Sequence, residues 1–217
     1  MVVQTPSSSD VQVREFCRHL NVRSKPVLLP ITADARSQPL DCFNNIRHKV
    51  ASEGGRIVYG WTIWIWPKVY IEAEHHAVFE RPGGGDWVDV TPSHTAGITS
   101  RLFVEDASAI YDFENEGVRR DNIRHALTRD VLVQQFFQSA RAYNDAMNAL
   151  PGVGEIRVSP AEAQHIQALQ VENARLTMQL ALKYSSRNDR CFCGSGEKFK
   201  RCHGDSRIQQ ARIRNAN

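Results

Sequence analysis

The chain has 217 residues, of which 41% are hydrophobic and 24% are charged. This composition is that of an ordinary folded protein in water, and the length suffices for one or two domains with hydrophobic cores. No segment offers the roughly 18 consecutive apolar residues that a membrane-spanning helix needs, which excludes a helical membrane protein. The net charge of +3 is too small to indicate nucleic-acid binding by itself.

The N-terminal segment and the cysteines both favour a cytoplasmic location. Residues 1–10 lack the basic start and the apolar stretch of a secretion signal. Three of the five cysteines lie between positions 191 and 202, beside a histidine. This spacing is typical of a metal site in a reducing compartment rather than of a disulfide framework.

The first fifty residues predict two helices. Apolar residues at helical spacing around Phe16 predict a short first helix, with Cys17 in the core. Residues 22–41 form a proline-rich connector. A second helix is expected over residues 42–52, because two glycines follow at positions 54 and 55 and end it.

Three runs rich in β-branched and aromatic residues come next. They cover residues 56–67, 69–80 and 86–92 and read as strands. The sequence RPGGG between the last two suits a hairpin loop. Tryptophans in such runs usually pack in the core of a sheet, which is where we expect Trp61, Trp64 and Trp66.

The second half of the chain is predicted to be helical. A helical pattern covers residues 115–150, and a segment rich in glycine and proline then breaks it. Ser159 with Glu162 forms a capping-box pattern that begins a helix over residues 160–184. We expect this helix to pair with another copy of the chain or with the main domain through a heptad seam of Ile166, Leu169, Asn173, Leu176 and Leu180.

A cysteine-rich motif lies close to the C-terminus. The sequence CFCGSGEKFKRCHG places its potential ligands, Cys191, Cys193, Cys202 and His203, in a C-x-C-x8-C-H pattern. Three thiolates and one imidazole are a standard tetrahedral set for structural Zn²⁺, and four protein ligands leave no open position for catalysis. The segment has almost no apolar core, so metal binding is expected to fold it.

This motif is similar to the SEC-C motif, C-x-C-G-S-G-x-K-[FY]-K-x-C-[CH]-G, at every characteristic position. Members of that family are small zinc-binding tails, found on the translocase motor SecA, on some methionine aminopeptidases and on many uncharacterised bacterial proteins. The resemblance implies binding to a protein or a ribosomal partner. The basic residues that follow the motif also favour contact between the C-terminus and RNA.

Residues 42–94 hold a second candidate site. Cys42 begins the second predicted helix, where backbone amides favour the thiolate form of a cysteine. His75 and His76 are neighbours on one strand, so they face opposite sides of the sheet, and Asp89 lies on the adjacent strand. A thiolate, a histidine base and an orienting carboxylate together can carry out nucleophilic catalysis.

The order cysteine, histidine, aspartate resembles that of transglutaminase-like and papain-type thiol enzymes, and HAVFERPGGGDWVDVTP is similar to the transglutaminase core. The resemblance implies a cytosolic cysteine hydrolase, protease-like enzyme or acyltransferase in which Cys42 is the nucleophile, His76 the base and Asp89 the orienting residue. Two alternatives stay open. The domain could be a non-enzymatic adaptor with Cys42 in its core, or a second metal site could use Glu74, His75 or His76.

These observations divide the chain into four parts. An α+β domain is expected over residues 1–115, and a helical extension over residues 116–158. An amphipathic helix over residues 159–186 then leads to a zinc module with a basic tail over residues 187–217. The predicted fold class is α+β, with a small antiparallel sheet and a cysteine-bearing helix, followed by helices and the zinc-binding tail.

Overall fold

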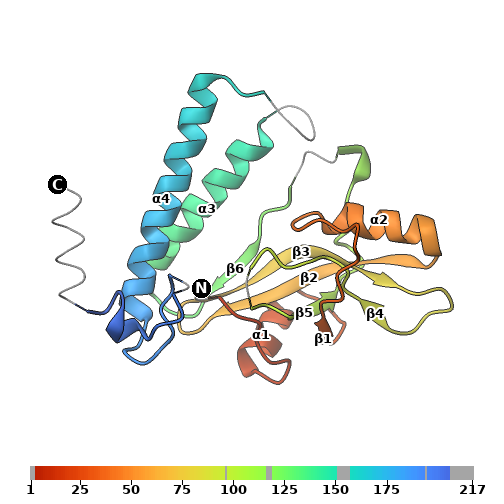
Figure 1. The fold of residues 1–217 in the computed structure, drawn as a ribbon, viewed down its shortest axis with the longest axis horizontal. Coiled ribbons are helices and arrows are strands. Elements are labelled where there is room, and N and C mark those ends of the chain that lie inside the picture. Colours follow the sequence, from red (N-terminus) through yellow and green to blue (C-terminus); the bar gives the residue numbers. More distant parts are fainter. Residues whose placement is uncertain (1–2, 96, 116–118, 151–156, 194, 206–217) are drawn as a thin grey trace.

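The computed structural model describes residues 3–95, 97–115, 119–150, 157–193 and 195–205. Within these ranges the chain is a mixed α+β fold, which confirms the predicted fold class (Figure 1). The main elements are α1 (Val11–His19), β1 (Val27–Pro30), α2 (Cys42–Glu53), β2 (Arg56–Trp66), β3 (Tyr70–Glu80), β4 (Trp87–Val88), β5 (Ser100–Glu105), β6 (Ile123–Ala126), α3 (Val131–Asn148) and α4 (Pro160–Tyr184), with short 3-10 helices at Phe113–Asn115 and Phe199–Arg201. None of the described helices combines the length and the apolar character needed to span a membrane.

The sheet is antiparallel, and its strands follow the order β1-β5-β2-β3-β4. β2 and β3 form its centre, a hairpin paired along its whole length, and the RPGGG loop joins β3 to β4 as predicted. β4 and β6 both pair with the outer edge of β3, at Phe79–Glu80 and at Tyr70–Ala73 respectively. Between these two contacts, residues 74–78 have no strand partner on that edge among the described residues.

The two outermost strands of the sheet approach each other. A parallel bridge joins Ile31, just after β1, to Asp89, just after β4, and the amide of Thr32 donates to the carbonyl of Asp89 at 2.8 Å. Away from this bridge the strands separate and leave a groove of about 510 Å³ lined by Val27, Leu29 and Trp87, among others. Asp89 therefore lies where the curled sheet closes on itself.

Helices α1 and α2 pack on different stretches of the β2–β3 hairpin. Val13, Phe16 and Cys17 of α1 enter the cluster that contains Ile63 and Ile71. The burial of Cys17 agrees with its predicted place in the core. Farther along β3, the α2 helix packs through Ile46 against Ala77, Phe79 and Val90. This contact fixes the N-terminal end of α2 beside the middle of β3.

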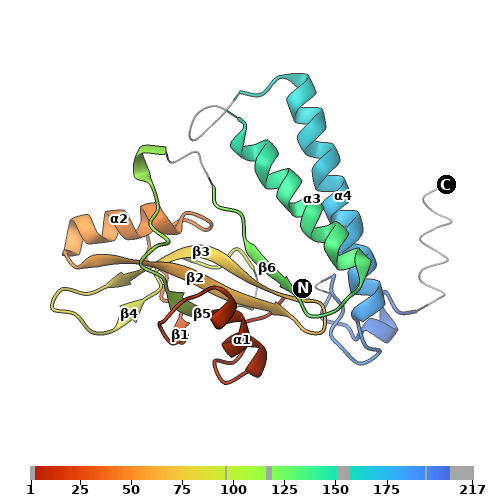
Figure 2. The same ribbon diagram turned by 180° about the vertical axis from the view of Figure 1, so that it is seen from behind.

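Helices α3 and α4 form a hairpin that stands off one end of the sheet (Figures 1 and 2). The predicted capping box is present, because Ser159 and Glu162 exchange hydrogen bonds of 2.7 and 3.2 Å. Leu176 and Leu180 of the predicted seam are buried, and Leu180 packs against α3 and Tyr70 of the sheet. The other seam residues, Ile166, Leu169 and Asn173, are half-buried, and pairing between copies stays a prediction.

Four strands differ from the sequence-based expectations. β1 lies inside the proline-rich connector, β5 follows the last predicted strand, and β6 falls in the segment predicted to be helical. β4 covers only Trp87–Val88 of the strand predicted over residues 86–92, so Asp89 follows this strand instead of lying on it. The helical prediction is wrong at Ile123–Ala126, because the edge of β3 pairs with this segment. Arg124 of β6 also reaches Glu72 of β3 at 3.2 Å, and tertiary pairing of this kind overrides a local helical preference.

Candidate functional site

Cys42 is the first residue of α2 and is 8% exposed. Asp41 precedes the helix without a side-chain cap. Its carbonyl accepts from the Asn45 amide at 3.0 Å, and its carboxylate accepts from the Asn44 side chain at 2.9 Å. Cys42 thus lies at the N-terminal end of the helix, which is the positive end of the helix dipole.

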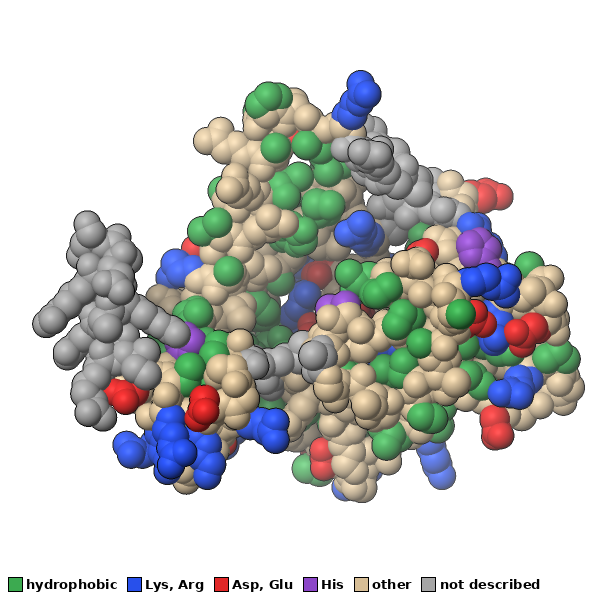
Figure 3. Space-filling model, in the orientation of Figure 1, with side chains coloured by type: hydrophobic (Ala, Val, Ile, Leu, Met, Phe, Trp, Pro, Cys, Tyr) green, Lys and Arg blue, Asp and Glu red, His purple; other side chains and the backbone are tan. Residues whose placement is uncertain are grey.

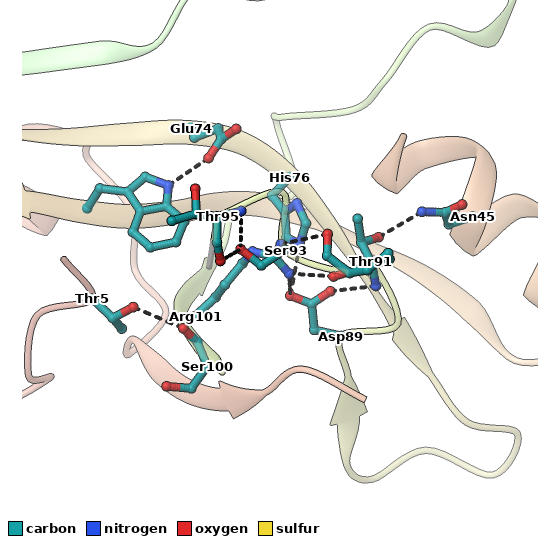
Figure 4. A network of polar contacts seen from close by, with 12 residues as sticks. Thr5, Asn45, Glu74, His76, Asp89, Thr91, Ser93, Thr95, Ser100 and Arg101 are labelled. Atoms are coloured by element: carbon teal, nitrogen blue, oxygen red, sulfur yellow. Dashed lines mark hydrogen bonds and ion pairs between the residues drawn. The ribbon is translucent and has the colours of Figure 1, made fainter. Parts of the chain in front are cut away.

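The structure brings the three predicted residues Cys42, His76 and Asp89 together. His76 is 5% exposed and lies on the part of β3 whose outer edge has no strand partner among the described residues. Its Nε2 lies 3.2 Å from Asp89 Oδ2 (Figure 4). Cys42 lies close enough to His76 to contribute to the raised pKa of the histidine. Asp89 is fully buried. Cys42 comes from α2, His76 from β3, and Asp89 from the segment that follows β4.

The electrostatics of the site favour an ion pair. Burial by itself lowers the pKa of His76, but the charges of Asp89 and Cys42 and the hydrogen bonds to them outweigh burial and raise it to about 10. Burial likewise raises the pKa of Asp89, whereas His76 and Arg101 lower it, and the net shift is downward. His76 is therefore an imidazolium near neutral pH, placed between a carboxylate and a sulfur atom.

Arg101 of β5 is a further buried member of this site and is missing from the sequence-based set. Its Nη1 donates to Asp89 Oδ2 at 2.6 Å and to the Thr91 carbonyl at 2.8 Å. Asn45 of α2 donates to Thr91 Oγ1 at 3.1 Å, so the loop after Asp89 is tied to α2 as well (Figure 4). A buried arginine needs an anionic partner, but the sequence alone does not say which acid supplies it.

His75 faces away from this site, as the strand alternation predicts. Its Nε2 lies 2.5 Å from the Ala109 carbonyl, and its ring packs on Phe43 at 4.6 Å between centroids. Burial is the main cause that lowers the pKa of His75. Glu74 instead accepts a hydrogen bond from Trp64 Nε1 at 2.6 Å. These residues form no metal-ligating cluster in the described part of the chain, where the one such cluster is C-terminal.

The C-terminal cluster has the geometry of a four-ligand metal site. The ligand atoms of Cys191, Cys193, Cys202 and His203 all lie within 4.8 Å of one another. The two sulfurs of Cys193 and Cys202 are 3.5 Å apart, and His203 Nδ1 lies 3.2 Å from Cys191 Sγ. A tetrahedral ion with bonds of about 2.3 Å to sulfur and about 2.0 Å to nitrogen separates its ligands by about 3.5 to 3.8 Å. The donor set and the distances fit such an ion.

A short hairpin and a 3-10 turn hold these ligands. The Cys191 amide donates to the Glu197 carbonyl at 2.7 Å, and the turn over Phe199–Arg201 then presents Cys202. Hydrogen bonds from Ser195 are the main cause that lowers the pKa of Cys193 to about 6, which favours the thiolate that a metal binds. Position 194, between these ligands, lies outside the described residues.

Phe199 forms the small core of this module. Its side chain is 9% exposed and packs with the two ligands Cys191 and Cys202. A Cβ atom at Gly204 would lie 2.8 Å from the Phe199 ring, so glycine is needed at that position. Phe192 reaches out of the module and packs against the cluster formed by α3, α4 and Tyr70. The module is thus attached to the helical hairpin.

Comparison with known proteins identifies one region of the chain. The family model described as the SEC-C motif matches residues 187–205. No curated protein and no solved structure shows significant similarity to the chain. The match covers the hairpin, the turn and the four potential ligands, and it supports a metal-binding SEC-C module at this end. The resemblance of residues 42–94 to a transglutaminase core receives no support from these comparisons.

Proposed function

We propose that the domain built around the sheet is a cysteine hydrolase or acyltransferase that acts on amides or esters. The observation that carries this proposal is the buried pair of His76 and Asp89, with 3.2 Å between Nε2 and Oδ2, and with Cys42 close enough to His76 to contribute to its raised pKa. It is supported by the position of Cys42 at the first residue of α2 and by the raised pKa of His76. Transglutaminase-like and papain-type enzymes, which the sequence of this region resembles, share this order of residues.

In the proposed reaction the Cys42 thiolate attacks the carbonyl carbon, a carbon–sulfur bond forms, and the carbonyl electron pair moves onto oxygen. The intermediate collapses, the bond to the leaving group breaks, and His76 donates its proton to the departing amine or alcohol. Neutral His76 then takes a proton from water, or from an acceptor amine, as it attacks the thioester. This second step releases the acyl group and restores the Cys42 thiolate and the His76 imidazolium.

We also propose that the C-terminal cluster binds Zn²⁺. The donor set of Cys191, Cys193, Cys202 and His203 supports this ion, since three thiolates with one imidazole suit zinc better than oxygen-preferring cations. All four positions of a tetrahedral ion would be filled by protein atoms. The proposed ion therefore has a structural role and takes no part in the reaction at Cys42.

A second candidate function is that of an adaptor which binds a protein or a ribosomal partner through this module. The observation that favours it is a basic surface, because the side chains of Arg187, Arg190, Lys198 and Arg201 are all exposed there. Figure 3 shows Lys and Arg side chains gathered over the C-terminal module. The basic tail that could contact RNA lies outside the described residues.

Alkylation of the zinc-loaded protein with iodoacetamide, mapped residue by residue by mass spectrometry, separates the two functions. We expect Cys42 to react well below pH 8, while Cys17, whose thiol pKa is raised by burial, stays unmodified. The Cys42→Ala protein should lose hydrolysis of an amide and ester panel and keep its thermal transition. Equal inertness of both cysteines in the folded protein would contradict the enzyme and favour the adaptor.

A further inference from the structure

We infer that Arg101 is a positioning residue of the thiol site, which keeps Asp89 charged and directed at His76 when His76 gives up its proton. The inference rests on the proposed function and names a residue that acts through Asp89 rather than on the substrate. Arg101 lies on β5 and is 6% exposed. It lies beside the fully buried carboxylate of Asp89.

The contacts of Arg101 fix both the carboxylate and the loop that carries it. Nη1 donates to Asp89 Oδ2 at 2.6 Å, and this is the same oxygen that His76 Nε2 approaches at 3.2 Å. Nη1 also donates to the Thr91 carbonyl at 2.8 Å, while Asp89 Oδ1 accepts from the Thr91 amide at 3.0 Å. The carboxylate is therefore held in one orientation, with one oxygen shared between the two cations.

A buried carboxylate without a cation takes up a proton, because a lone charge in a low-dielectric interior is costly. Asp89 has two cationic partners, but His76 loses its charge when it protonates the leaving group. Arg101 keeps its charge at every pH at which the protein is folded. It would hold Asp89 as an anion during that step, so that His76 can recover its proton from the next nucleophile.

Four charges meet here in the proposed reaction. Asp89 and the proposed Cys42 thiolate are the anions, and His76 of β3 and Arg101 of β5 are the cations that contact Asp89. Glu74, on the same strand as His76, is bound to Trp64. Neither β1 nor β2, which flank β5, brings a charged side chain into contact with Arg101 among the described residues. Loss of Arg101 leaves an excess of negative charge, which disfavours the thiolate.

The test is the pH dependence of Cys42 alkylation by iodoacetamide in Arg101→Met and Arg101→Lys proteins. We expect the midpoint of the acid limb to move upward by about one pH unit in Arg101→Met, and mostly to return in Arg101→Lys, which keeps the charge. Arg56→Met is the matched control, since Arg56 is half exposed and pairs with Glu80 and Glu105 instead. Its profile should equal that of the unchanged protein.

If the Arg101→Met protein folds and the midpoint of its Cys42 alkylation is unchanged, the inference is overturned. Arg101 then has a structural role alone. If Arg101→Met fails to give a thermal transition, Arg101→Gln, which retains donors to the Thr91 carbonyl, gives the same test, with the same upward shift expected. If the proposed function is wrong, the result differs from this one, because Cys42 of the unchanged protein then stays unmodified by iodoacetamide at every pH. In that case the role of Arg101 in a thiol site is rejected with it.

Discussion

At the scale of single residues, the contact between His76 and Asp89 links folding to pH. The pKa of His76 is about 10 in the folded protein, above the value of about 6.5 of an unfolded histidine. The charged His76 therefore stabilises the folded protein fully below about pH 6.5, and this contribution to the free energy of unfolding is lost as the pH rises toward 10. The pKa of Asp89 is lowered, so its contribution is present above about pH 4 and is lost in acid.

We expect the free energy of unfolding, measured by urea denaturation, to be largest near pH 5 to 6 and to fall steadily from pH 7 to pH 10. In the Asp89→Asn protein the fall should be much smaller, because the strongest anion beside His76 is gone. A free energy of unfolding that stays constant from pH 7 to pH 10 in the unchanged protein would be inconsistent with a charged, buried His76.

The sequence identifies some members of the thiol site and not others, for a physical reason. Cys42 follows from its place at a helix start, and strand alternation shows that only one of His75 and His76 can face Asp89. Arg101 and Asn45 have no such local signal. Their partners, Asp89 and Thr91, lie on a loop whose place beside β5 and α2 depends on the whole sheet.

At the scale of the elements, the α3–α4 hairpin depends on a few buried leucines. Leu180 is fully buried and packs against α3 and the end of the sheet, whereas Leu182 is 39% exposed. We expect Leu180→Ala to lower the free energy of unfolding by about 2 to 5 kcal/mol. Leu182→Ala is the matched control, with an expected change within about 0.5 kcal/mol. Equal effects in urea denaturation would show that the seam does not pack as described.

Local signals explain which elements the sequence predicts well. The start of α4 follows from Ser159, Pro160 and Glu162, because a cap and a first-turn proline act within one helical turn. The strands β1 and β6 have four residues each, and no local signal like a helix cap marks where they begin. They exist because strands β5 and β3 offer them an unpaired edge, and that edge is known only once the β2–β3 hairpin is in place.

At the scale of the whole molecule, pairing of two copies through residues 160–184 stays a prediction. Leu176 and Leu180 are already buried within the chain, so a second copy would meet the exposed face of α4, where Val171 and Met178 lie. If copies pair there, Met178→Glu should convert a dimer into a monomer in light scattering. A monomeric mass for the unchanged protein at high concentration would contradict the pairing.

The two ends of the molecule also differ in how far the sequence determines them. The metal ligands are predictable because their spacing is fixed by a tetrahedron and a short hairpin, all within residues 187–205. The closure of the sheet at Ile31 and Asp89 is not, because it joins segments nearly sixty positions apart through backbone groups alone. A backbone contact of this kind requires no particular residue type, so a sequence pattern does not predict it.

Removal of the metal should unfold the C-terminal module and leave the sheet domain intact. The core of the module consists of Phe199 with the ligands Cys191 and Cys202, which is too little apolar surface to fold without an ion. The clusters around β2 and β3 contain none of these ligands. After chelation we expect hydrogen exchange to rise over residues 187–205, while the strands β2 and β3 stay protected.

Metal analysis should give one Zn²⁺ per chain in the unchanged protein and a large loss of zinc in the Cys193→Ser protein. Full zinc content in Cys193→Ser, or loss of protection in β2 and β3 after chelation, would contradict a metal-folded and separate module.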